Sequence, residues 1–197
     1  MNIIEVKDLP LMGCIAFGII DRGTNLVQVR CTSVCNLNCI FCFTDAGTTS
    51  KHHQVEYVVD KDLLVGWVKN VIELKQESDI EINLDSAGEV TTYKDLVSLV
   101  KEIRKLPEVK FISMQSNGFA LTEKLIDELA AAGLNRINLS LHTLDLEKAK
   151  HLMGCSFYNI EKMKDRVKYL VKSSIELELA PVWMHGLNDQ DIEDIIA

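Results

Sequence analysis

Residues that disorder a chain are scarce in this sequence of 197 residues, which has 3 Pro and 10 Gly. That scarcity excludes a collagen-like or low-complexity chain, and a hydrophobic share of 47% is enough for a packed core. Long apolar runs are missing too, since no stretch approaches the roughly 18 residues of a membrane span. Glu5, Lys7 and Asp8 stand where a signal peptide has its apolar region. We therefore expect a cytoplasmic protein without a membrane segment.

Positively charged residues are also fewer than negatively charged ones. The 21 Lys and Arg residues stand against 29 Asp and Glu residues, so the net charge is −8 at neutral pH. Nucleic-acid binding over a broad surface needs clustered Lys and Arg that neutralise phosphates. We therefore expect no broad nucleic-acid-binding surface.

Strand and helix patterns alternate along most of the chain. Five segments have the composition of strands: 26–30, 80–84, 110–114, 136–141 and 175–183. Apolar residues recur at helical spacing in 61–76, 92–106, 122–132 and 159–172, and a further helix begins at Asp191. Such units predict an α/β fold with a parallel sheet, whose ligands bind at the carboxyl ends of the strands. The pattern leaves open a doubly wound sheet or part of a (β/α) barrel, since a full barrel needs about 250 residues.

The first 25 residues are predicted to form an N-terminal hairpin or edge extension. Residues 14–21 and 26–30 are short apolar runs, and the turn-forming Arg22-Gly-Thr-Asn25 separates them. The main domain is therefore expected to span 26–197.

The cysteines are the most informative residues in the sequence. Four of the six lie between Cys31 and Cys42, and in a reducing compartment such a cluster indicates metal ligands or catalytic thiols. Cys35, Cys39 and Cys42 have the spacing C-x3-C-x2-C directly after the strand at 26–30. Three thiolates on one loop can hold three irons of a cubane cluster and leave the fourth iron open to a ligand.

Two other metal sites compete with this interpretation. Zinc usually takes two C-x2-4-C pairs or added histidines, and no second pair follows here, so zinc is the weaker alternative. A four-cysteine cluster would use Cys31 as its fourth ligand, and the chain would then be a non-catalytic electron-transfer or structural module. Cys31 at the end of a strand also suits a small buried hydrophobic residue.

The cysteine motif, with Phe41 before its last cysteine, resembles that of the radical S-adenosylmethionine (radical SAM) superfamily. The resemblance covers essentially the whole chain. It is greatest to uncharacterised archaeal proteins similar to the radical SAM enzymes of molybdenum-cofactor biosynthesis, through segments 16–25 and 44–47. It implies a parallel-sheet partial (β/α) barrel. The family core has a sixth unit, so we expect 26–197 to form a core that stops after the fifth strand, with the sixth unit missing.

The resemblance also implies a site. Cys35, Cys39 and Cys42 would hold a [4Fe–4S] cluster, with S-adenosylmethionine (SAM) bound beside it. Gly88-Glu89 resembles the Gly-Gly-Glu segment of the family, and Gln115-Ser-Asn-Gly118 resembles its Thr-Asn-Gly turn. The implied SAM contacts are Phe41, Gly88, Glu89, Ser116, Asn117 and Ser140. Simple packing is the alternative role for Phe41, because buried aromatic residues mostly pack.

The implied chemistry is radical formation. One electron from the reduced cluster would cleave SAM, and the resulting 5′-deoxyadenosyl radical would abstract hydrogen from an unknown substrate. A low-potential electron donor is an implied partner. The open sheet edge after the fifth strand also predicts self-association or a completing chain. His142, near the expected mouth of the site, is a candidate either for SAM or substrate contact or for a structural hydrogen bond.

Overall fold

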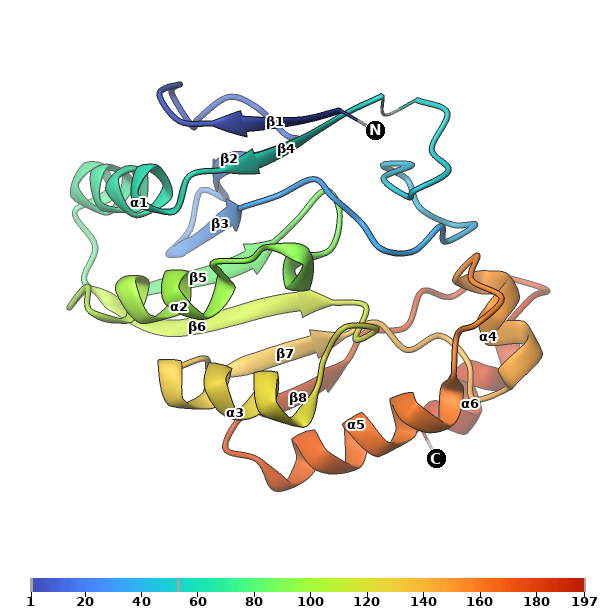
Figure 1. Cartoon of the computed structure of the whole chain (residues 1–197). Coiled ribbons are helices and arrows are strands. Elements are labelled where there is room, and N and C mark those ends of the chain that lie inside the picture. The colour runs from blue at the N-terminus through green and yellow to red at the C-terminus, as the bar shows by residue number, and fades with distance from the viewer. Residues whose placement is uncertain (1, 53, 197) are drawn as a thin grey trace.

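The computed structural model describes residues 2–52 and 54–196. Its centre is a six-stranded sheet with the order β2-β3-β5-β6-β7-β8 (Figure 1). β2 (Gly18–Asp21) runs antiparallel to its neighbour, and the remaining five strands are parallel. These five are β3 (Leu26–Arg30), β5 (Ile80–Asp85), β6 (Val109–Ser116), β7 (Arg136–Leu139) and β8 (Glu176–Leu179).

The strand order distinguishes the two topologies that the sequence leaves open. Each parallel strand pairs with the next parallel strand along the chain, so the order never reverses as it does in a doubly wound sheet. The covering helices follow one another in the same sequence over one face of the sheet. They are α1 (Lys61–Lys75), α2 (Leu96–Arg104), α3 (Glu123–Ala132) and α5 (Ile160–Lys172). The sheet is therefore a partial (β/α) barrel, open at β8 in the described part of the chain.

Alternation along the strands separates an apolar face from a polar one. In β5, Ile80, Ile82 and Leu84 are buried in the core beneath the helices. The side chains between them point to the opposite face, which we call the inner face. Asn83 on that face donates a hydrogen bond of 2.8 Å to Ser113 of β6. Polar side chains at the inner face therefore link neighbouring strands.

The five predicted parallel strands and the four covering helices are confirmed, with differences at their ends. α2 begins at Leu96 rather than at residue 92, because residues 90–92 form the 3₁₀ helix η1 (Val90–Thr92). β8 ends at Leu179 rather than at residue 183, because Pro181 has no backbone N–H for a further ladder bond. α6 (Asp189–Ile196) begins slightly earlier than predicted, and α4 (Leu146–Leu152) precedes α5.

The N-terminal region has a more complex structure than the predicted hairpin. The hairpin itself is confirmed as β2 and β3. A separate two-stranded parallel sheet joins β1 (Asn2–Val6) to β4 (Val55–Val59), and neither strand was expected. The amide of Ser33 donates a 2.9 Å hydrogen bond to the carbonyl of Tyr57, which attaches this small sheet to the chain after β3. The division into 1–25 and 26–197 stays a prediction.

No helix within residues 2–52 and 54–196 is both long enough and apolar enough to cross a membrane.

Replacement of Asp60 tests the local stability of α1. Its side chain caps the helix by accepting hydrogen bonds from the amides of Asp62 and Leu63, at 2.9 and 3.0 Å. We expect Asp60→Ala to lower the free energy of unfolding by about 1 kcal/mol, as for other caps. Asp60→Asn keeps an acceptor and is the control in urea unfolding. Equal stability of the two variants would contradict this role of the cap.

Candidate functional site

All nine residues predicted for the site line one cavity of about 410 Å³. The cavity lies at the carboxyl ends of the parallel strands, where loops from distant parts of the sequence meet (Figure 1). These residues are Cys35, Cys39, Phe41, Cys42, Gly88, Glu89, Ser116, Asn117 and Ser140. The structure therefore brings the whole predicted set together, while the role of each residue stays a prediction.

The cysteine loop after β3 is anchored to the end of α4. The amide of Asn38 donates to the carbonyl of Met153 at 3.2 Å, and the amide of Ile40 donates to that of Leu152 at 3.0 Å. The Sγ atom of Cys39 lies 3.8 Å from Sδ of Met153. The backbone of the loop is therefore fixed by bonds outside the cavity, which leaves the thiols available to line it.

Burial controls the protonation of these thiols. It raises the pKa of Cys35 to about 11 and that of Cys39 to about 12. Both groups are therefore neutral thiols at neutral pH in the metal-free chain. A bound iron would displace their protons, because coordination deprotonates a thiol outright.

The donor set fits an iron–sulfur cluster better than a single metal ion. Among the described residues, no three His, Cys, Asp or Glu side chains converge on one point as the ligands of one ion do. In a cubane cluster each thiolate binds a separate iron, so the ligands surround the cluster instead. Cys35, Cys39 and Cys42 all line one cavity. Three thiols that line one cavity fit the donor set of a [4Fe–4S] cluster with one open iron.

Cys31, the alternative fourth ligand, is separate from the other three. It is fully buried in the apolar core and does not line the cavity. Burial raises the pKa of its thiol far above the usual range. The structure therefore shows Cys31 as a small core residue.

The buried carboxylate of Glu89 joins the loop after β5 to the loop after β6. Its oxygens accept hydrogen bonds from the hydroxyl of Ser116 at 2.8 Å and the amide of Asn117 at 2.7 Å. The amide and hydroxyl of Thr91 also donate to it. Burial raises the pKa of Glu89 above its ordinary value, against the opposing effect of these bonds. The side chain of Glu89 is thus engaged within the protein and positions its neighbours.

A second bond joins these loops to the cysteine loop. The side-chain amide of Asn117 donates a 2.8 Å hydrogen bond to Oδ1 of Asn36, which follows Cys35. Three loops that are far apart in sequence are therefore linked around one cavity.

Close approach of two backbone segments requires a glycine at position 88. A Cβ atom at this position would lie 2.2 Å from the carbonyl oxygens of both Ser33 and Val34. The loop after β5 can therefore lie against the start of the cysteine loop only if residue 88 has no side chain.

Phe41 and His142 pack together at the cavity wall. Their ring centroids are 4.6 Å apart in an edge-on arrangement. His142 is buried, and its Nδ1 accepts a 2.9 Å hydrogen bond from the amide of Val182. Phe41 therefore both lines the cavity and packs against His142. Of the two roles predicted for His142, its environment matches the structural hydrogen bond.

Thr44 and Gln115 also line the cavity but were not predicted as site residues. Thr44 donates a 2.8 Å hydrogen bond to the carbonyl of Ala87, and its hydroxyl lies 3.2 Å from Sγ of Cys42. Thr44 could have been predicted as a site residue from its position two residues after the last cysteine of the motif. For Gln115 the signal was its place just before Ser116 at the end of a strand.

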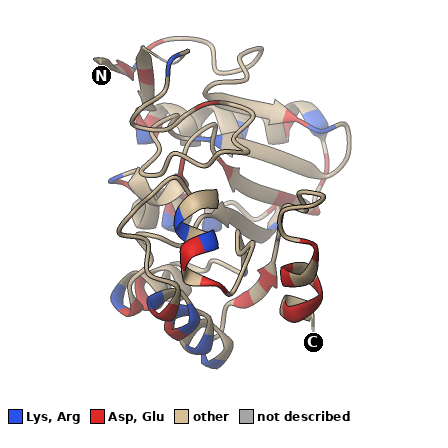
Figure 2. Cartoon of the chain, turned by 90° about the vertical axis from the view of Figure 1, so that its right-hand side faces the viewer, with Lys and Arg blue, Asp and Glu red and all other residues tan. Residues whose placement is uncertain are grey.

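Charges around this end of the molecule are mixed. Figure 2 looks onto the carboxyl ends of the strands and shows acidic residues on α6, with both signs interspersed on α4 and α5. Asp85 lies at the cavity and is paired with Arg30 at 3.0 Å.

Comparison with known proteins identifies the class to which this fold and site belong. The model of the radical SAM superfamily matches residues 29–197. The chain therefore belongs to the radical SAM superfamily, whose enzymes use a [4Fe–4S] cluster and SAM.

Individual relatives agree with this assignment. An uncharacterised protein of Methanocaldococcus jannaschii is 44% identical over 192 residues, which are 96% of this chain and 44% of that protein. A GTP 3',8-cyclase of Petrotoga mobilis is 30% identical over 182 residues, covering 89% of this chain and 52% of the enzyme. The chain thus spans about half the length of the curated relatives that it matches.

Solved structures share the fold at low sequence identity. The structure of anSMEcpe with bound AdoMet has a TM-score of 0.62 and 17% identity, and the match covers 87% of this chain and 49% of that one. Methylornithine synthase has a TM-score of 0.62 and 15% identity, with 86% and 47% covered. These neighbours support the partial-barrel fold.

Gly88→Ala tests the close approach beside the cavity. The added Cβ would collide with two backbone carbonyls, and we expect the free energy of unfolding to fall by roughly 1–3 kcal/mol. Gly66→Ala is the matched control, because an added Cβ there meets nothing within 4 Å. That change lies inside α1 and is expected to stabilise the protein by about 0.5–1 kcal/mol. Chemical unfolding curves that show no difference between the variants would refute the steric argument.

The buried ring of His142 predicts a pH dependence of stability. Burial lowers its pKa from 6.5 to about 4, so the unfolded chain binds a proton in that interval and the folded chain does not. Stability is therefore lost as the pH falls from 6.5 to about 4, by up to roughly 3 kcal/mol. Urea unfolding at several pH values measures this loss. His142→Asn does not titrate, and an equal loss in that variant would assign the effect to other groups.

Proposed function

We propose that this chain is the SAM-cleaving core of a radical SAM enzyme. In this proposal, Cys35, Cys39 and Cys42 hold a [4Fe–4S] cluster, and SAM binds in the same cavity. The observation that carries the proposal is the convergence of these thiols and all the predicted SAM contacts on one cavity. When bound, the cluster and SAM together supply a 5′-deoxyadenosyl radical that abstracts hydrogen from a substrate.

Hydrogen bonding divides the predicted SAM contacts into two groups. Ser116 donates to Glu89 and accepts from the amide of Gly118 at 3.0 Å, so its hydroxyl is engaged within the protein. The side chain of Asn117 donates to Asn36 and accepts from the amide of Phe119 at 2.9 Å. We therefore assign Glu89, Ser116 and Asn117 to positioning of the cavity wall.

Ser140, Gly88 and Phe41 are better placed for direct contact with SAM. Within residues 2–52 and 54–196, the hydroxyl of Ser140 makes no hydrogen bond, and its amide is held by the carbonyl of Ser116 at 2.9 Å. A fixed serine with a free hydroxyl suits the polar groups of a bound ligand. Gly88 lets backbone approach without a side chain, and Phe41 offers an apolar surface.

The apolar residues of the cavity serve a second purpose. A primary radical reacts with water or with stray groups unless the site excludes them. Phe41, Ala87 and Val182 all line the cavity. We assign to them the shielding of the reacting end of the ligand.

Two partners belong to the same proposal. The cluster needs a low-potential electron donor before each cleavage. The outer edge of β8 is the other partner site, because no strand pairs with it among the described residues, and a free edge can pair with another strand. We propose that a second copy or a completing segment covers this edge.

Anaerobic reconstitution tests the proposed function. The protein is loaded with iron and sulfide, reduced with dithionite and given SAM, and 5′-deoxyadenosine is measured by chromatography. We expect product from the wild type and none from the triple variant Cys35→Ala, Cys39→Ala, Cys42→Ala. Cys31→Ala is the matched control and should keep both cluster and product, because Cys31 lies away from the cavity. Loss of the cluster in the single variant Cys31→Ala would instead support the electron-transfer module.

A further inference from the structure

His142 contacts two parts of the cavity wall that come from opposite halves of the chain. Its ring packs edge-on against Phe41 of the cysteine loop, with centroids 4.6 Å apart. Its Nδ1 accepts a hydrogen bond of 2.9 Å from the amide of Val182, beyond β8. Both Phe41 and Val182 line the cavity, and His142 itself lies behind them.

The sheet itself does not hold Val182. The ladder of β8 ends at Leu179, and the last backbone bond to the neighbouring strand runs from the amide of Ala180 to the carbonyl of Leu139, at 2.9 Å. Pro181 then interrupts the pattern, because it has no N–H to donate. The position of Val182 therefore depends on side chains.

Asn188 makes a second set of side-chain hydrogen bonds that hold the segment containing Val182. Its side chain is fully buried, and its Nδ2 donates to the carbonyls of His142 at 3.0 Å and Val182 at 2.9 Å. Its Oδ1 accepts from the amide of Met184 at 2.7 Å. His142 and Asn188 together thus bind both the N–H and the C=O of Val182.

We propose that His142 and Asn188 form a latch that fixes Phe41 and Val182 as two walls of the SAM pocket. The inference rests on the proposed function for the identity of the ligand and adds positioning residues that act through the wall. When the contacts of the latch are made, both walls are ordered before SAM binds. Without it, binding must also order the segment, which lowers the affinity.

The chemistry of the latch requires a neutral imidazole. Nδ1 can accept the hydrogen bond from Val182 only if it carries no proton, so the ring proton resides on Nε2. The ring contacts Phe41 and the Val182 amide, and His142 lines a small cavity together with apolar residues that include Leu141 and Met153. No charged side chain is among the residues lining the small cavity beside it. A neutral acceptor is therefore compatible with everything around His142.

Two substitutions separate the two contacts of the ring. His142→Phe keeps a ring against Phe41 and removes the acceptor for Val182. His142→Asn keeps an acceptor at the position of Nδ1 and removes the outer part of the ring. Each variant is examined by hydrogen exchange at the Val182 amide in the metal-free protein. Iron and sulfide content and the equilibrium dissociation constant for SAM are then measured in the reconstituted protein.

We expect His142→Phe to exchange the Val182 amide at least about tenfold faster and to bind SAM about tenfold more weakly, a change of about 1.4 kcal/mol. Its iron and sulfide content should equal that of the wild type. His142→Asn should keep the protection of the amide and recover part of the SAM affinity. Such a rescue would not follow if His142 mattered only for general stability.

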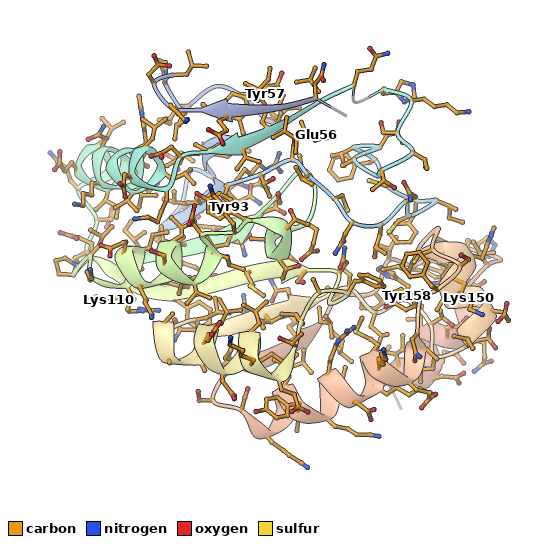
Figure 3. The ribbon with its side chains drawn as sticks, in the orientation of Figure 1. Glu56, Tyr57, Tyr93, Lys110, Lys150 and Tyr158 are labelled. Atoms are coloured by element: carbon orange, nitrogen blue, oxygen red, sulfur yellow. The ribbon has the colours of Figure 1, made fainter. Side chains whose placement is uncertain are left out.

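Tyr93→Phe is the control for lost stability alone. The hydroxyl of Tyr93 donates a 2.8 Å hydrogen bond to the carbonyl of Val59 in the core. Figure 3 labels this side chain, which does not line the cavity. The variant should lose a buried bond and leave SAM affinity and Val182 exchange unchanged.

The outcomes distinguish the latch from the proposed function. Wild type that binds SAM, together with His142→Phe that binds it equally well, overturns the latch and leaves the function standing. Wild type that assembles no cluster overturns the function, while exchange at Val182 still tests the latch. If His142→Phe does not fold, Asn188→Asp replaces it, since a carboxylate would repel the two carbonyls that Asn188 now binds. Unchanged exchange at Val182 in that variant also overturns the latch.

Discussion

The site depends most on the hydrogen bonds that the buried carboxylate of Glu89 accepts. It accepts hydrogen bonds from Thr91, Ser116 and the amide of Asn117, and so fixes the loops after β5 and β6 to each other. The bond from Asn117 to Asn36 extends this network to the cysteine loop. A charged group buried at this depth is tolerated only when its hydrogen bonds are made. The polar connections of the cavity therefore lie in its walls, and the three cysteines and Ser140 line it.

The wall on the other side is held by a different type of contact. Val182 lies beyond the last ladder bond of β8 and is bound by His142 and Asn188 rather than by the sheet. Phe41 packs on the same imidazole. Charged and amide groups thus order one side of the cavity, and a neutral ring orders the other. This combination suits a site that must position a polar cofactor and keep water from a reactive radical.

Local patterns predicted much of this fold because each helix and strand carries its own periodicity in the sequence. The periodicity of each helix and strand is visible within ten to fifteen residues, and Thr122 and Gly133 bound α3 as predicted. β1 and β4 escaped prediction because their pairing joins segments about fifty residues apart, which a local pattern does not show. The nine site residues converge because parallel strands bring their carboxyl ends to one edge. The sequence could not show that Ser116 and Asn117 both bind Glu89, since those bonds join distant loops. The suggestion that Cys31 is a small buried residue agrees with its full burial.

The central claim is that three thiolates hold a cluster whose fourth iron is free to bind SAM. Mössbauer spectroscopy of the anaerobically reconstituted protein, recorded with and without SAM, tests it most directly. We expect the signal of one iron in four to change on addition of SAM, because that iron has no cysteine ligand. A four-iron cluster whose spectrum does not respond to SAM, or a protein that assembles no cluster, would contradict the account.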